Sequence, residues 1–127
     1  GKEAIKFFLS EYPDKLVIAE IEKPDGAADN NDQRIARHRF YDRLGFHTFD
    51  FDVNVLGCDF LTLAFGPGAD DRDVVAEKYV SFVVPLLLYA YTKTGIFGDN
   101  PRELGFDGKK YRYEDIFPDA APDTDNA

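Results

Sequence analysis

The chain has 127 residues, which suits one domain, and 44% of them are hydrophobic and 15% aromatic, so a substantial core can form. Its formal charge of −9 and the absence of a lysine and arginine block exclude the usual footprint of a nucleic-acid-binding protein and fit a positively charged partner such as an amine. The single cysteine excludes an internal disulfide and favours a reducing, cytoplasmic location, and no apolar run reaches the roughly 20 residues that a membrane span needs.

The first part of the chain alternates helix and strand patterns. Residues 2–12 predict an amphipathic helix that Pro13 ends, because proline cannot continue a helix. Residues 15–22 are rich in β-formers and predict a mostly buried strand. After an acidic loop, residues 32–44 predict a second helix, and Gly45 stands where a helix-terminating glycine belongs.

A hairpin and a third helix follow. Residues 46–55 alternate apolar and polar side chains, with Phe49, Phe51, Val53 and Val55 on one face, and residues 59–65 predict a strand that pairs with them. A third helix is expected to start at Asp70 and Asp71, and Pro85 is expected to kink or break it. The apolar stretch from Val80 to Tyr91 would cover the sheet, pack on another part of the fold or form a homodimer contact.

These patterns predict an α+β fold with the order helix, strand, helix, strand, strand, helix in residues 1–95. Residues 96–127 are rich in Gly, Pro and Asp. They are expected to form an irregular C-terminal extension that is partly disordered, with disorder in the last ten residues and local docking at residues 111–117.

The second predicted helix ends in a distinctive pattern. In residues 39–46, Phe40, Tyr41, Gly45 and Phe46 form a Phe-Tyr-x-x-x-Gly-Phe motif. With the strand before it and the hairpin after it, this motif resembles the C-terminal half of the GNAT superfamily of N-acetyltransferases, over roughly residues 1–65. The resemblance implies a mixed sheet with flanking helices, the C-terminal portion of that fold, and acetyl-CoA as co-substrate.

Tyr41 is the first candidate catalytic residue. From the last turn of a helix a phenol can point toward a groove and donate a proton to a departing thiolate. In the family, the matching tyrosine often protonates the sulfur of coenzyme A as it leaves. The alternative is a core aromatic side chain whose hydroxyl is hydrogen-bonded.

The resemblance also implies residues that bind the cofactor. The family holds the pyrophosphate in a Gln/Arg-x-x-Gly-x-Gly/Ala loop at a helix N-terminus, where backbone N–H groups point at the ligand. Gly1 and Lys2 match only the tail of that loop, so the N-terminal half of the same fold would come from upstream or from another chain. Arg37 and its basic neighbours on the helix would contact phosphates, or else form a solvated face paired with Asp and Glu.

Glu20 and Glu22 are the candidates for a general base. They stand two apart on a strand and therefore face the same side. A carboxylate beside the acyl group could deprotonate an amine, although in the family such a base often lies on the preceding strand. The alternatives are a polar strand end and an ion pair with a nearby arginine.

No metal site is predicted, because His38, His47 and Cys58 have no recognisable ligand spacing. Cys58 is expected to be a small packing residue rather than a nucleophile.

The leading hypothesis is an enzyme that transfers an acetyl group from acetyl-CoA to a small-molecule or peptide amine. A competing hypothesis is a GNAT-like module without catalysis that serves protein binding or assembly. A third is a purely structural α+β domain in which the Phe-Tyr-x-x-x-Gly-Phe match is chance.

Overall fold

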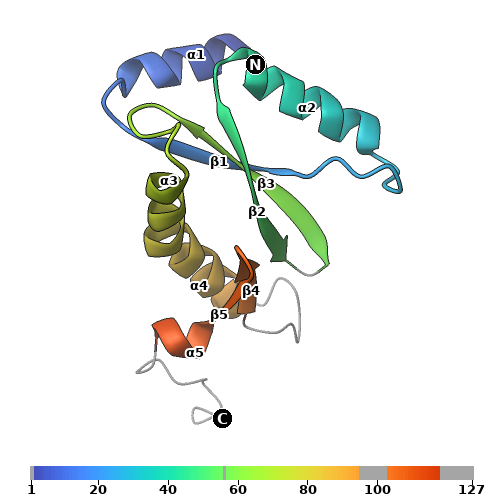
Figure 1. Ribbon diagram of the computed structural model, residues 1–127, viewed down its shortest axis with the longest axis vertical. Coiled ribbons are helices and arrows are strands. Elements are labelled where there is room, and N and C mark those ends of the chain that lie inside the picture. The colour runs from blue at the N-terminus through green and yellow to red at the C-terminus, as the bar shows by residue number, and fades with distance from the viewer. Residues whose placement is uncertain (1, 56, 95–102, 118–127) are drawn as a thin grey trace.

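The computed structural model describes residues 2–55, 57–94 and 103–117, which form one sheet with flanking helices (Figure 1). In chain order the elements are α1 (Lys2–Glu11), β1 (Val17–Glu22), α2 (Asn31–Arg43), β2 (His47–Val55), β3 (Cys58–Phe65), α3 (Arg72–Lys78), the π-helical turn η1 (Tyr79–Val83), α4 (Val84–Thr94), β4 (Glu103–Phe106), β5 (Lys109–Arg112) and α5 (Tyr113–Ile116). The α+β class and the order helix, strand, helix, strand, strand, helix are confirmed.

The sheet has five strands in the order β1-β3-β2-β4-β5. The predicted hairpin is confirmed, since β2 pairs with β3. β1 pairs with the other side of β3 and forms an edge of the sheet that the described residues build. Every pairing among the described strands is antiparallel, so the part of the chain that the structure describes does not contain the parallel pair of a mixed sheet.

The alternation along β2 gives the sheet its buried and exposed faces. Phe51, Val53 and Val55 are buried, whereas the intervening Asp52 and Asn54 are exposed, as the period of two predicts. Asp52 has a positive φ of 53°, and the register with β3 shifts between Phe49 and Val53. Such an irregularity bends one strand and increases its twist.

Two hydrophobic cores lie on opposite faces of the sheet. The α1–α2 core consists of buried Ile21, Phe46, Leu61 and Leu63, with Leu9, Val17, Ala19, Tyr41, Leu44 and Phe65 packed against them. The α3–α4 core consists of buried Phe51, Val53, Val55, Ala64, Ala69, Val75, Tyr79, Val84, Leu88, Leu104, Phe106 and Tyr113. Figure 1 shows α1 and α2 at the top of the view, with α3 and α4 below them.

Pro85 does not break the third helix. The backbone remains helical from Arg72 to Thr94, and the turn before Pro85 widens into η1, in which the Val84 N–H donates to the Tyr79 carbonyl. Proline has no N–H, and its ring collides with the carbonyl one regular turn earlier. A wider turn at this point keeps the chain helical where a regular α-helix would be interrupted.

The C-terminal range is more regular than the sequence predicts. β4 and β5 pair with each other as a hairpin, and Gly105 of β4 pairs with Asn54 of β2. Leu104, Phe106 and Tyr113 are buried in the α3–α4 core. The prediction of an irregular extension is therefore wrong for residues 103–116, which form two strands and a short helix. The strands are too short to give a clear periodic pattern in the sequence, and burial of their apolar side chains stabilises them. The predicted disorder of the last ten residues and the helix end at Gly95 lie outside the described residues.

Gly66 follows β3 at a point where its backbone lies close to the backbone of Lys15. Its φ is +106°, and a Cβ at this position would collide with the backbone carbonyl oxygen of Lys15. We expect Gly66→Ala to lower the free energy of unfolding by about 2 kcal/mol or more, measured by urea denaturation. Gly26→Ala is the matched control, since a Cβ added at Gly26 would have no neighbouring atom within 4 Å. Equal urea midpoints for the two variants would contradict this account.

Candidate functional site

The Phe-Tyr-x-x-x-Gly-Phe motif forms the junction between α2 and β2. Gly45 has a φ of +94°, a conformation that glycine adopts without strain, and it turns the chain out of the helix. The Phe46 N–H then donates to the Tyr41 carbonyl at 3.2 Å. This turn brings the Phe46 ring edge-on to the Tyr41 ring at 5.1 Å, and the Phe40 ring stands at 5.3 Å. The motif therefore fixes the Tyr41 ring by local geometry.

Tyr41 lies on the same side of the sheet as α1. Its partly buried ring packs against the α1–α2 core, to which Leu9 of α1 also belongs. Its hydroxyl has no hydrogen-bond partner among the described residues. The ring thus has the packing of a core aromatic side chain, and none of the described residues forms a hydrogen bond with its hydroxyl.

The predicted phosphate contacts have different surroundings. Lys2 in α1 and Arg37 in α2 are exposed, and neither forms an ion pair within the described residues. Arg37 precedes Tyr41 by one helical turn, so both lie on the same side of α2. Arg34, in contrast, pairs with Glu22 at 2.7 Å and donates to the Lys23 carbonyl at 3.0 Å. Gly1 lies outside the described residues.

The two candidate bases have different partners. Glu22 forms the ion pair with Arg34, which is the structural alternative that the sequence offers for it. Glu20 instead accepts a hydrogen bond of 2.6 Å from the Tyr79 hydroxyl in η1. Glu20 therefore faces the α3–α4 core, and the structure does not bring it to the face of the sheet that carries Tyr41.

The environment of Glu20 is unusual for a carboxyl group. Burial raises its pKa above the ordinary value of 4.5, because desolvation disfavours the charged form. The hydrogen bond from Tyr79 lowers the pKa and offsets only part of that effect. Tyr79 is the hydrogen-bond partner of this carboxyl that sequence reasoning did not identify. The one sequence feature that points to Tyr79 is its spacing from Val75. Residues four apart lie on the same side of a helix, so Tyr79 is predicted to be buried with Val75.

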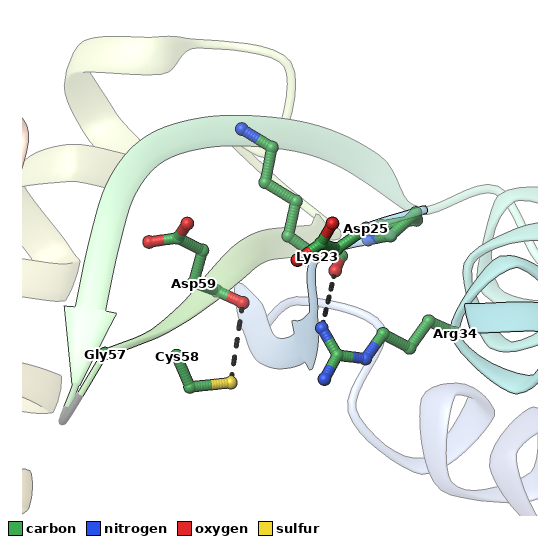
Figure 2. Close-up of a pocket in the computed structure, with 7 residues that line it drawn as sticks. Lys23, Asp25, Arg34, Gly57, Cys58 and Asp59 are labelled. Atoms are coloured by element: carbon green, nitrogen blue, oxygen red, sulfur yellow. Dashed lines mark hydrogen bonds between the residues drawn. The ribbon is translucent and has the colours of Figure 1, made fainter. Parts of the chain in front are cut away.

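A polar pocket opens where β1 ends beside the β2–β3 turn (Figure 2). Its volume is about 500 Å³, and its lining consists of Lys23, Pro24, Asp25, Arg34, Gly57, Cys58 and Asp59. Lys23 pairs with Asp50, which raises the pKa of Lys23 and lowers that of Asp50. Arg34 pairs with Glu22.

This pocket is not suited to the phosphates of coenzyme A. Both of its cations are neutralised by ion pairs, and Asp25 and Asp59 add negative charge to the lining. The Cys58 sulfur contacts the Asp59 carbonyl at 3.9 Å. Of the residues expected to bind acetyl-CoA, neither Lys2, Arg37 nor Tyr41 lines the pocket.

Within the part of the chain that the structure describes, no group of His, Cys, Asp and Glu side chains is arranged to hold a metal ion. The described helices also include none whose length and apolar character would let it cross a membrane. No protein-family model, curated protein or solved structure matches this chain.

The buried Glu20 carboxyl predicts a specific dependence of stability on pH. Because its pKa is raised in the folded state, the Glu20 carboxyl holds its proton more tightly in the folded protein than in the unfolded chain. The contribution of Glu20 to stability is thus present at low pH and lost as the pH rises through the folded pKa. Glu20→Gln keeps an acceptor for Tyr79 without a charge, so its unfolding free energy should fall less over this window.

Urea denaturation at a series of pH values measures this effect. Glu3→Gln, on the exposed surface of α1, is the matched control and should follow the wild-type profile. A Glu20→Gln profile parallel to that of the wild type would contradict the assignment of this pH dependence to Glu20.

Proposed function

We propose that this chain is the C-terminal portion of a GNAT-type N-acetyltransferase, which moves an acetyl group from acetyl-CoA to an amine by direct attack. The observation that carries the proposal is the position of Tyr41. Its ring is held by Phe40 and Phe46 at the end of α2, on the same side of the sheet as α1, and its hydroxyl has no partner among the described residues. A phenol held in this way is suited to proton donation.

The proposed chemistry assigns separate tasks to Tyr41 and β1. As the amine nitrogen bonds to the acyl carbon and the bond from carbon to sulfur breaks, Tyr41 donates its proton to the departing sulfur. On its outer edge β1 has no strand partner among the described residues, which leaves backbone N–H groups there to polarise the acyl carbonyl oxygen. The excess proton of the amine passes to a carboxylate or to water, and solvent reprotonates Tyr41.

The residues present fit a phosphate-bearing co-substrate near α1 and α2. Lys2 and Arg37 are exposed cations without ion-pair partners in the described part of the chain. The amino end of α1 adds the favourable field of a helix N-terminus. These groups would hold the phosphates of acetyl-CoA, with Tyr41 nearer to the thioester.

The surface of α1 supports the N-terminal half of the same fold as a partner. Phe7, Phe8 and Tyr12 are 67%, 50% and 48% exposed, and α1 has no fully buried residue. The outer edge of β1, which has no strand partner among the described residues, is a second surface with unpaired backbone groups. Surfaces of this kind are normally covered by another segment.

The same surface favours the second candidate function, a GNAT-like module without catalysis that serves protein binding or assembly. Exposed aromatic side chains beside an open strand edge are suited to strand addition by a partner. Binding of acetyl-CoA separates the two candidates, since only the enzyme requires it.

We expect the intact gene product to bind acetyl-CoA in a calorimetric titration and to release free coenzyme A when supplied with primary amines. Tyr41→Phe removes the proton donor and keeps the ring, so turnover should fall by roughly a hundredfold with little change in acetyl-CoA affinity. Tyr89→Phe, at an exposed position on α4, is the matched control.

An unchanged turnover in Tyr41→Phe would remove Tyr41 from the proposed role. The absence of binding heat, together with no competition by coenzyme A, would reject the enzyme in favour of the assembly module.

Coverage of α1 can be measured separately in the intact gene product. If the N-terminal half packs on α1, Phe8→Ser should lower the free energy of unfolding by about 2 kcal/mol, as expected when a buried aromatic side chain is removed. Lys6→Ser, at an exposed polar position of the same helix, should cost less than about 0.5 kcal/mol. Equal and small effects in the two variants would show that Phe8 remains solvated and would reject this partner.

A further inference from the structure

The helical segment formed by η1 and α4 carries a row of large apolar side chains on its outer side, which we call the outer stripe. It consists of Phe82, Leu86 and Tyr89, which are 66%, 65% and 50% exposed. Their spacing of four and three residues places them along one side of the helix. Val84 and Leu88 point the other way and are buried in the α3–α4 core. The segment therefore has two apolar sides, and the outer one stays largely exposed within the part of the chain that the structure describes.

The area of the outer stripe is that of an interaction site. A whole side chain of this size offers about 200 Å², so the three exposed fractions leave roughly 350 Å² of apolar surface. Apolar patches of a few hundred Å² are often functional. Two such stripes face to face bury about 700 Å² before any flanking side chain is counted, against the roughly 1,000 Å² that a specific interface requires. The area therefore suits a weak and reversible contact.

The outer stripe lies away from the surfaces that the N-terminal half of the fold is proposed to cover, which are α1 and the outer edge of β1. β1 is the first strand in the sheet order β1-β3-β2-β4-β5, whereas α4 packs against β4 and α5 at the other end of that order. Figure 1 shows the same arrangement, with α4 beside β4 and β5 and away from α1. The outer stripe is therefore left to another occupant.

The order of side chains along the outer stripe suits a second copy of the same chain. Leu86 stands in the middle, with Phe82 four residues before it and Tyr89 three residues after it. When two such helices meet antiparallel about a two-fold axis, Leu86 faces Leu86, and Phe82 of each copy meets Tyr89 of the partner subunit. The apolar row is thus complementary to itself, and the same contact forms twice.

The charges at the ends of the outer stripe favour the antiparallel direction. Glu77, five residues before Phe82, is exposed and has no ion pair among the described residues. Lys93, four residues after Tyr89, is also exposed. Antiparallel pairing brings each Glu77 to Lys93 of the partner subunit, whereas a parallel pair places like charges together. Lys78, whose ammonium group lies over the Phe82 ring at 5.6 Å, is next to Glu77, so each end of the pair joins one glutamate with two lysines.

We propose that the outer stripe is a dimer interface, in which two copies of this chain pair antiparallel through η1 and α4 about a two-fold axis at Leu86. The interface is separate from Tyr41, α1 and β1, so it does not depend on the proposed acyl transfer. Because the apolar area is small, the dissociation constant is expected to be on the order of 10 μM.

Sedimentation velocity of the intact gene product, over concentrations on both sides of this dissociation constant, measures the association. We expect a reversible equilibrium between monomer and dimer. Leu86→Glu places two like charges at the centre of the interface and should leave the protein monomeric over the whole range. Ala36→Glu, which adds the same charge at an exposed position of α2, is the matched control and should dimerise like the wild type.

Circular dichroism checks that both variants are folded. A wild-type protein that stays monomeric at every concentration would overturn the proposal, because another segment or solvent then covers the outer stripe. A folded Leu86→Glu variant that still dimerises would overturn it as well, because the dimer then forms through a different surface.

An exchange of charges tests the antiparallel direction. Glu77→Lys and Lys93→Glu each bring like charges together at both ends of the pair, so either variant alone should dimerise roughly three- to tenfold more weakly than the wild type. In an equal mixture of the two variants, each end of a mixed dimer again joins opposite charges at positions 77 and 93. The mixture should therefore associate with about the wild-type affinity. A mixture that associates no better than either variant alone would overturn the antiparallel pairing.

Discussion

Strand β3 is the constraint on which the rest of the molecule depends. It lies between β1 and β2 and pairs antiparallel with both. Its side chains alternate, so that Leu61 and Leu63 enter the α1–α2 core while Ala64 enters the α3–α4 core. Both cores are therefore built on one strand, and the same alternation turns Thr62 toward Glu20 and Tyr79. A buried polar residue in this central strand is retained at a cost in stability.

The two candidate groups for chemistry follow from two different kinds of constraint. Tyr41 is held by a local device, in which the positive φ of Gly45 returns Phe46 to the Tyr41 ring. Glu20 is held by a long-range device, a hydrogen bond to a residue 59 positions later in the chain. The position of Tyr41 depends on a short sequence motif. The position of Glu20 depends on the register of β1 and on the widened turn η1 ahead of Pro85.

The open edge of β1 connects these groups. On its outer edge β1 has no strand partner among the residues that the structure describes, and its neighbouring side chains face the two cores in alternation. The polar pocket at the end of β1 has a different character, since its lysine and arginine are already paired with carboxylates. The proposed acyl transfer is accordingly assigned to the edge and not to that pocket.

The sequence by itself determined the local elements: the helices near residues 2–12 and 32–44, the hairpin of β2 and β3, the buried face of β2, and the motif that surrounds Tyr41. Periodicity and glycine placement report on neighbouring residues, so these features could be predicted without knowledge of the fold. Only the tertiary structure decided that β3 lies between its two partners, that Glu22 pairs with Arg34, and that Glu20 is buried against Tyr79. A periodic pattern shows which side of an element is apolar, but not which element will cover it. The short strands β4 and β5 were also decided by the tertiary structure, because they are stabilised by burial of Leu104 and Phe106 and show no periodic pattern of their own.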